Sequence, residues 1–165
     1  MGIFLIMRAK AKFASKSEVK PTNQISASKP NTAAQLNNFI SLVLPYLHNS
    51  SSWHIREELL NVLIICFLKS KNFYEFDPYK IFEALLQMLD DSKDRIRFTA
   101  LEAIVAFVSI GNKLSAKEII NQLADKQISE LISERLEASA DMTPYLNENG
   151  ALELPYLEHI ELAAN

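Results

Sequence analysis

The sequence predicts an all-α protein built from repeated antiparallel helix pairs. Three Gly and six Pro among 165 residues, with long stretches free of both, favour helices over the turn-rich layout of a small β domain. Apolar residues recur at three- and four-residue spacing, which is the period of an amphipathic helix. With 48% hydrophobic and 22% charged residues, the chain is long enough for one compact domain and too polar for a membrane protein.

Residues 1–32 are expected to form a flexible basic arm. From Lys10 to Asn31 the chain is mostly Ala, Ser, Lys, Pro, Thr, Asn and Gln, a composition that cannot bury enough apolar surface to offset the entropy of ordering. Residues 1–35 carry six Lys and Arg against one acid, whereas residues 114–165 carry three against ten. Such an arm could be attracted to nucleic acid, anionic lipid or an acidic protein lattice, or it could be only a solvated tail.

The first helix pair is expected after the arm. A helix begins at Thr32 or its neighbours, and Pro45 should kink its last turn or end it, because the ring displaces the carbonyl one turn back. Residues 48–52 form a polar turn, in which Ser51 or Ser52 is a ready N-cap for a helix that starts at Trp53. The expected inward residues are Leu36, Phe39, Ile40, Val43, Leu44 and Leu47, then Ile55, Leu59, Val62, Leu63, Cys66 and Phe67.

A second pair follows. Asp77 serves as cap and Pro78 as first helical position, which is a strong start signal. This helix stops at residues 90–92, and the next one ends at Gly111. The inward residues of the pair are Ile81, Phe82, Leu85, Leu86 and Leu89, then Ile96, Ala100, Ala103, Ile104, Phe107 and Val108.

The two pairs repeat one another. Residues 55–67 match residues 96–108 at a constant shift of 41 without gaps, and the preceding helices match at a shift of 42. A helix-pair period of about 40 to 47 residues is that of HEAT and armadillo repeats. Each pair buries its apolar face only against the next, so the sequence predicts a short α-solenoid of HEAT-type pairs.

The remainder of the chain is expected to close the stack. Ser115 caps a helix over residues 116–124, and another spans about residues 127–135 with Ile128, Leu131, Ile132 and Leu136 inward. These form a degenerate third pair, so the helical domain covers residues 33–138. Residues 139–165 are interpreted as an extended acidic tail with at most a short helix near residues 157–162.

Catalytic chemistry is not expected. His48, His54 and His159 lie at no spacing suited to a metal or to a nucleophile and base, and the chain has no glycine-rich phosphate loop. The single cysteine, Cys66, falls on the buried face and suggests a structural role in a reducing compartment. We therefore predict no enzyme activity, no cofactor and no metal. The apolar start, residues 1–7, is too short to span a bilayer, and no membrane partner is expected. A nucleic-acid partner is not expected either, since the body is not basic.

Two features of the turns inside the helix pairs could bind a partner. Trp53 starts a helix at a solvent-facing turn, where a tryptophan is either a binding anchor or a local packing lid. Lys93 and Arg95 are the exposed cations of the equivalent turn in the second repeat. Arg56 and Arg97 share one register and are interpreted as structural, because a long side chain there can pair with acids of the neighbouring repeat.

Several segments together resemble the TOG domains of microtubule regulators. They are residues 51–61 (SSWHIREELLN), 74–77 (YEFD), 94–105 (DRIRFTALEAIV), 135–136 (RL) and 144–150 (PYLNENG). The chain is most similar to the first TOG domain of the crescerins, the TOG array regulators of axonemal microtubules, with cytoplasmic linker-associated proteins as relatives. The likeness covers roughly residues 36–152. The Trp at the turn, the YEFD segment and the Pro/Gly tail are its more specific parts.

The resemblance implies binding to tubulin or the microtubule lattice through the turns within each helix pair. Trp53 is then the anchor, with Ser52 and His54 beside it, and Lys93 with Arg95 meets the acidic surface of tubulin. Attachment to ciliary, axonemal microtubules in the cytoplasmic cytoskeleton would follow, with other axonemal proteins as further partners. The alternative is a HEAT adaptor that binds a non-tubulin protein along its concave helix face or its acidic tail.

Overall fold

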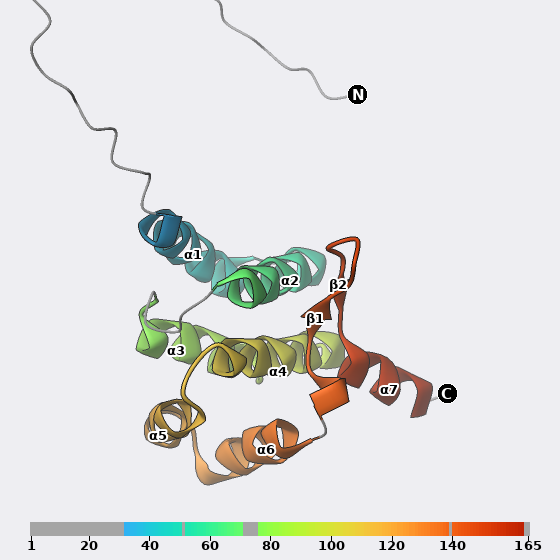
Figure 1. Cartoon of the computed structure of the whole chain (residues 1–165). Coiled ribbons are helices and arrows are strands. Elements are labelled where there is room, and N and C mark those ends of the chain that lie inside the picture. Colours follow the sequence, from blue (N-terminus) through green and yellow to red (C-terminus); the bar gives the residue numbers. More distant parts are fainter. Residues whose placement is uncertain (1–31, 51, 71–75, 139, 164–165) are drawn as a thin grey trace, which may run out of the picture.

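The computed structural model describes residues 32–50, 52–70, 76–138 and 140–163. Almost all of the expected basic arm lies outside these residues, as do Ser51 and the first two residues of the YEFD segment. Within the described part, three helix pairs stack in layers (Figure 1). The predicted all-α, HEAT-type solenoid is confirmed.

The described part of the stack contains six helices. They are α1 (Thr32–Asn49), α2 (Trp53–Lys69), α3 (Pro78–Met88), α4 (Asp94–Ser109), α5 (Lys113–Leu123) and α6 (Lys126–Glu137). A 3₁₀ turn, η2 (Ala140–Met142), then leads to a two-stranded antiparallel hairpin, β1 (Tyr145–Leu146) with β2 (Leu152–Glu153), and to α7 (Pro155–Ala163). Gly150 has a φ of 75° in the tight turn of this hairpin, a conformation that glycine adopts without steric strain.

The helix starts follow local capping chemistry. Asp77 accepts a hydrogen bond from the Lys80 N–H at 3.4 Å, and Pro78 opens α3 as expected. The expectation that Ser115 caps the fifth helix is wrong, because that helix starts earlier and Asn112 accepts from the Leu114 N–H at 2.9 Å. Of the two expectations for Pro45, a kink or the end of the first helix, the second is wrong, since α1 continues to Asn49.

The core is built around α4, which packs on α2, α3, α5, α6 and α7. The Phe107 ring lies at its centre, with centroids 4.7 Å from Phe67, 5.2 Å from Phe82 and 5.9 Å from Phe76. These distances are typical of favourable tilted and edge-to-face aromatic pairs. Helices of both repeats therefore share one aromatic cluster.

Three residues expected to face inward do not. Phe39, Ile55 and Leu131 are exposed. Leu131 precedes the fully buried Ile132 on α6, and neighbouring residues on a helix point about 100° apart. Phe39 and Ile55 lie on the first repeat, which has no described repeat before it to cover them.

The C-terminal tail differs from the extended segment that was expected. It folds back so that α7 packs on α4 and β1 lies against α2, and the expected short helix near residues 157–162 is present as α7. Leu157 is the side chain of α7 that is buried by this packing. The tail therefore packs along one side of the helical stack, next to α2 and α4, instead of trailing from it (Figure 1).

Arg135 holds this tail in place. Its guanidinium makes two hydrogen bonds to the Glu102 carboxylate on α4, at 2.7 and 2.8 Å, and both side chains are fully buried. The same guanidinium donates to the Met142 carbonyl and lies 4.2 Å from the centre of the Tyr156 ring. Burial raises the pKa of Glu102, and the hydrogen bond and charge of Arg135 oppose that rise. One side chain thus joins α6, α4, η2 and the start of α7.

We expect Arg135→Met to destabilise the fold strongly. Removing one partner of a buried ion pair leaves the other charge unpaired, which typically costs about 3–5 kcal/mol. Urea unfolding at neutral pH measures this loss. Lys126→Met on the same helix, at a highly exposed lysine, is the matched control and should change stability little. The double variant Glu102→Leu/Arg135→Met should recover part of the loss. Equal effects of Arg135→Met and Lys126→Met would contradict this role.

Candidate protein-interaction edge

The turns inside the first two helix pairs meet at one edge of the stack. Trp53 from the first turn and Ser92, Lys93, Asp94 and Arg95 from the second line one shallow hollow of about 360 Å³. These turns are about 40 residues apart in the chain, and the packing of α2 against α4 brings them together. The structure therefore gathers Trp53, Lys93 and Arg95 at one place.

Trp53 lies between the hydrophobic core and the surface of the edge. It is the first residue of α2 and is partly buried against the hydrophobic core, yet it also lines the hollow. The centroid of its ring lies 3.5 Å from the ring centroid of the exposed His54, with an angle of 31° between the two ring planes. Ser52 occupies the N-cap position, but its side chain makes no cap hydrogen bond. An indole fixed in this way presents an apolar surface at the turn.

Arg56 and Arg97 make the same hydrogen bond in the two repeats. Arg56 donates through one terminal nitrogen to the Ser50 carbonyl at 2.8 Å, and Arg97 donates to the Asp91 carbonyl at 2.7 Å. In both cases the carbonyl lies six residues before the arginine. Each arginine therefore ties its helix to the turn that precedes it, which fixes the shape of that turn.

Asp91 connects the two turns. Its carboxylate lies 2.7 Å from Arg56 Nε, accepts from a terminal nitrogen of Arg56 at 3.1 Å, and accepts from the Lys93 N–H at 2.9 Å. The side chains of Asp91 and Arg56 are only 7% and 13% exposed. Burial by itself raises the pKa of Asp91, but these hydrogen bonds and the charges of Arg56 and Arg97 outweigh it and lower the pKa below its usual value.

The two cations of the second turn have different surroundings. Arg95 is paired with Glu57 on α2 and with Glu161 on α7. Lys93 is exposed, and its ammonium makes no ion pair within the part of the chain that the structure describes. The partners of Arg95 could not be predicted from the sequence, because Glu161 lies 66 residues away in a tail expected to be extended. The Lys93 ammonium therefore has the greater capacity to meet a partner's acidic group.

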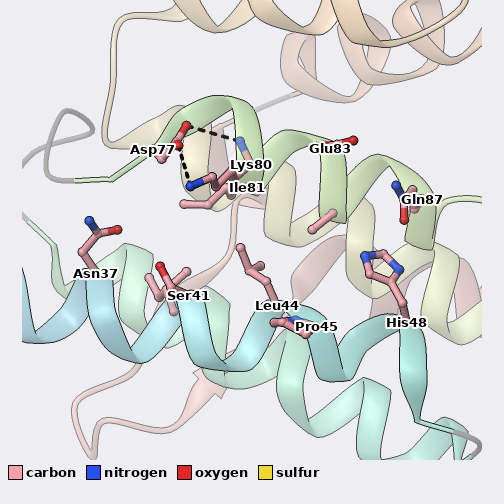
Figure 2. Close-up of a pocket in the computed structure, with 12 residues that line it drawn as sticks. Asn37, Ser41, Leu44, Pro45, His48, Asp77, Lys80, Ile81, Glu83 and Gln87 are labelled. Carbon is pink, nitrogen blue, oxygen red and sulfur yellow. Dashed lines mark hydrogen bonds and ion pairs between the residues drawn. The ribbon is translucent and has the colours of Figure 1, made fainter.

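A separate groove of about 400 Å³ runs between α1 and α3 (Figure 2). Ile40, Leu44 and Ile81 give it an apolar floor, and polar side chains line its two sides. The Lys80 ammonium lies 3.4 Å from the Asp77 carboxylate at one end. The groove contains none of the predicted site residues. It is the seam where the first helices of the two repeats meet.

Neither concavity has the groups expected of a metal site. Among the described residues, no three His, Cys, Asp or Glu side chains come together in a way that could hold a metal ion. The same part of the chain contains no helix that is both long and apolar enough to cross a membrane. The thiol of Cys66 is half-buried, and burial raises its pKa, which disfavours the reactive thiolate.

Comparison with known proteins agrees with this architecture. The HEAT repeat family matches residues 81–111, which span most of α3 and all of α4. No curated protein matches the chain in sequence. A solved structure of crescerin, which uses a TOG domain array to regulate microtubules in the primary cilium, matches with a TM-score of 0.59 and 27% identity. The match covers 72% of this chain and 49% of that chain, so the present chain spans about half of the crescerin structure.

These likenesses confirm the predicted resemblance to TOG domains. The HEAT match lies on the second repeat, whereas the crescerin match extends over most of the chain. HEAT and TOG-like folds are non-catalytic repeat types. The protein is a HEAT-type helical solenoid, similar in fold and sequence to the TOG domain structure of crescerin.

We expect Asp91→Asn to weaken the fold in a pH-dependent way. The folded-state pKa of Asp91 is lowered, so its stabilising contribution is fully present above the unfolded pKa of about 3.9 and is lost as pH falls through the folded pKa. The loss at neutral pH should be about 1–2 kcal/mol. Urea unfolding at neutral pH and at successively lower pH checks the trend. Asp94→Asn, at a carboxylate that is 76% exposed, is the control and should have a smaller effect. A loss from Asp91→Asn that persisted undiminished at low pH would argue against the ion pair.

Proposed function

We propose that this protein is a non-catalytic, TOG-like module that binds tubulin or the microtubule lattice through the edge formed by residues 48–53 and 90–95. The observation that carries the proposal is the shared hollow in which Trp53 and Lys93 meet. The likeness to crescerin, which regulates microtubules, supports it. Ser52, His54 and Arg95 belong to the same edge.

The edge combines an apolar anchor with positive charge. A partly buried tryptophan loses little conformational freedom on binding, and such residues often contribute most of the energy of a protein interface. Lys93 offers an ammonium to an acidic surface, which raises the association rate and fixes orientation. Arg95 shares its charge with Glu57 and Glu161, so its contribution to binding is expected to be smaller than that of Lys93.

The edge is preorganised. The hydrogen bonds of Arg56 and Arg97 to the turn carbonyls, and the Arg56–Asp91 ion pair between repeats, hold both turns before a partner arrives. Binding then requires little ordering of the backbone, which preserves affinity. A rigid edge of this kind acts as a docking surface that binds without a conformational change.

The proposed place of action is the axoneme of a cilium, within the cytoplasmic cytoskeleton. The edge consists of two turns, and two turns supply fewer contacts than a longer row of turns. Attachment to an assembled lattice, where other axonemal proteins complete the contact area, suits such a module better than capture of free tubulin. Its role would be to support the assembly or stability of these microtubules.

The alternative function is a HEAT adaptor for a non-tubulin protein. The acidic tail is less available for it than the sequence suggested, since α7 packs on α4 and Glu161 is paired with Arg95. A pulldown from ciliated-cell extract that recovers a defined partner without tubulin would favour this alternative.

We expect Lys93→Glu to weaken co-sedimentation with microtubules, because it places a carboxylate against an acidic surface. Trp53→Ala should weaken it further, by about 2 kcal/mol or roughly 30-fold in Kd, the typical loss for an aromatic anchor. Binding curves on assembled microtubules measure the Kd of both variants. Because the Trp53 side chain also packs against the core, circular dichroism of Trp53→Ala should be measured to establish that the variant is folded.

Lys117→Glu is the matched control, since it makes the same charge change at an exposed lysine of α5. It should leave binding nearly unchanged. A second comparison removes residues 1–31, the basic segment before α1. If that deletion abolishes binding while Lys93→Glu and Trp53→Ala have no effect, the edge is not the site.

A further inference from the structure

The outer helix of the first repeat has an unusual composition. Over its 18 residues, α1 contains no Asp, Glu, Lys or Arg, although 22% of the chain is charged. It nevertheless exposes large apolar side chains: Phe39 is 43% exposed, Leu42 69% and Tyr46 64%. Ile55 on the neighbouring helix α2 is 52% exposed. Depletion of charge together with exposed aromatic and aliphatic groups is typical of the centre of a protein interface.

The repeat register shows what these positions normally do. The shift of 42 between the first helices and of 41 between the second helices assigns each of the four residues an equivalent in the second repeat. The pairs are Phe39 with Ile81, Leu42 with Ala84, Tyr46 with Met88, and Ile55 with Ile96. The four equivalents are 1%, 6%, 6% and 0% exposed. Positions that are buried in the second repeat are therefore open in the first.

The reason lies in the stacking order. Helices α3 and α4 are covered by α1 and α2, which precede them in the stack (Figure 1). Among the described residues, no helix pair precedes α1 and α2. Within the described residues, the face made by Phe39, Leu42, Tyr46 and Ile55, called here the uncovered face, therefore has no helix pair stacked on it.

We propose that a second copy of this chain covers the uncovered face, in a two-fold symmetric dimer that packs α1 and α2 against α1 and α2. Two-fold dimers, in which the same patch of each subunit meets its copy, are the commonest homo-oligomers. Because α1 contains no Asp, Glu, Lys or Arg, two copies of α1 meet without like-charge repulsion. On α2, the exposed Glu58 is equivalent to the buried Thr99, so the dimer has to leave this carboxylate at the solvated rim of the interface. The proposal is independent of the microtubule-binding edge, which involves different residues.

Head-to-tail stacking of copies is disfavoured by the other end of the stack. The outer sides of α5 and α6 carry many exposed polar groups. They include Lys117, Asn121, Lys126, Glu130, Glu134 and Glu137. Pressing these groups against Phe39 and Leu42 would remove charges from water without providing partners, which is energetically unfavourable. Although Leu114, Leu123 and Leu131 are also exposed on these helices, the many charges make this end resemble the capping repeats that terminate solenoids. A two-fold dimer uses the same face of both copies, so it closes and does not extend into a filament.

The test is the molar mass of the full chain in solution, measured by light scattering after size exclusion and by sedimentation equilibrium. The expected mass is twice the 18.7 kDa of one chain. Leu42→Glu, at a side chain that the monomer leaves largely exposed, should retain the fold and weaken the dimer by at least about tenfold, because two carboxylates would be brought into one apolar interface. Leu114→Glu, on α5 at the opposite end and 72% exposed, is the matched control and should leave the mass doubled.

Three results would overturn the proposal. The first is a monomeric wild-type chain at high micromolar concentration, which would leave the face to a different helical partner. The second is a mass that grows beyond the dimer with concentration, as head-to-tail stacking requires. The third is dissociation by Leu114→Glu as strong as that by Leu42→Glu. Circular dichroism of both variants confirms that they are folded, so any change in mass reports on association.

Discussion

The ion pair between Arg56 and Asp91 is the constraint on which the candidate site depends. It joins the turn of one repeat to the turn of the next, at 2.7 Å and with little exposure to solvent. The same Asp91 carboxylate accepts from the Lys93 N–H, and the backbone carbonyl of Asp91 accepts from the Arg97 guanidinium. Two loops that belong to different helix pairs therefore behave as one edge, and the positions of Trp53 and Lys93 relative to each other follow from it.

A second constraint anchors the C-terminal tail. Arg135 and Glu102 are charged groups in the core, and they are tolerated because each hydrogen-bonds the other in a two-bond pair. The Met142 carbonyl and the Tyr156 ring add contacts to the same guanidinium. The tail is thus anchored on α4, which lets Glu161 reach Arg95. The buried Arg135–Glu102 pair therefore contributes to the difference between Arg95, which is paired with the tail, and Lys93, which is exposed.

The surfaces of the solenoid differ because its repeats are not equivalent in position. The second repeat is covered on both sides, whereas the first lacks a described neighbour on one side and the third presents charges to solvent. Equivalent residues such as Ile55 and Ile96 therefore have opposite exposures. A stack of similar units therefore has one end with exposed apolar side chains and another end rich in exposed charges.

The sequence by itself determined the helices, the repeat of about 41 residues and the turns that carry Trp53, Lys93 and Arg95, because helix periodicity and capping residues act over a few positions along the chain. It also indicated the TOG-like resemblance, which structural comparison supports. Only the tertiary structure decided that Arg95 is paired, that Arg135 is buried and that the tail folds back. These contacts join residues 33 to 66 positions apart, and such distant pairs leave no local pattern. Periodicity shows which face of a helix is apolar, whereas the neighbouring elements determine whether that face is covered.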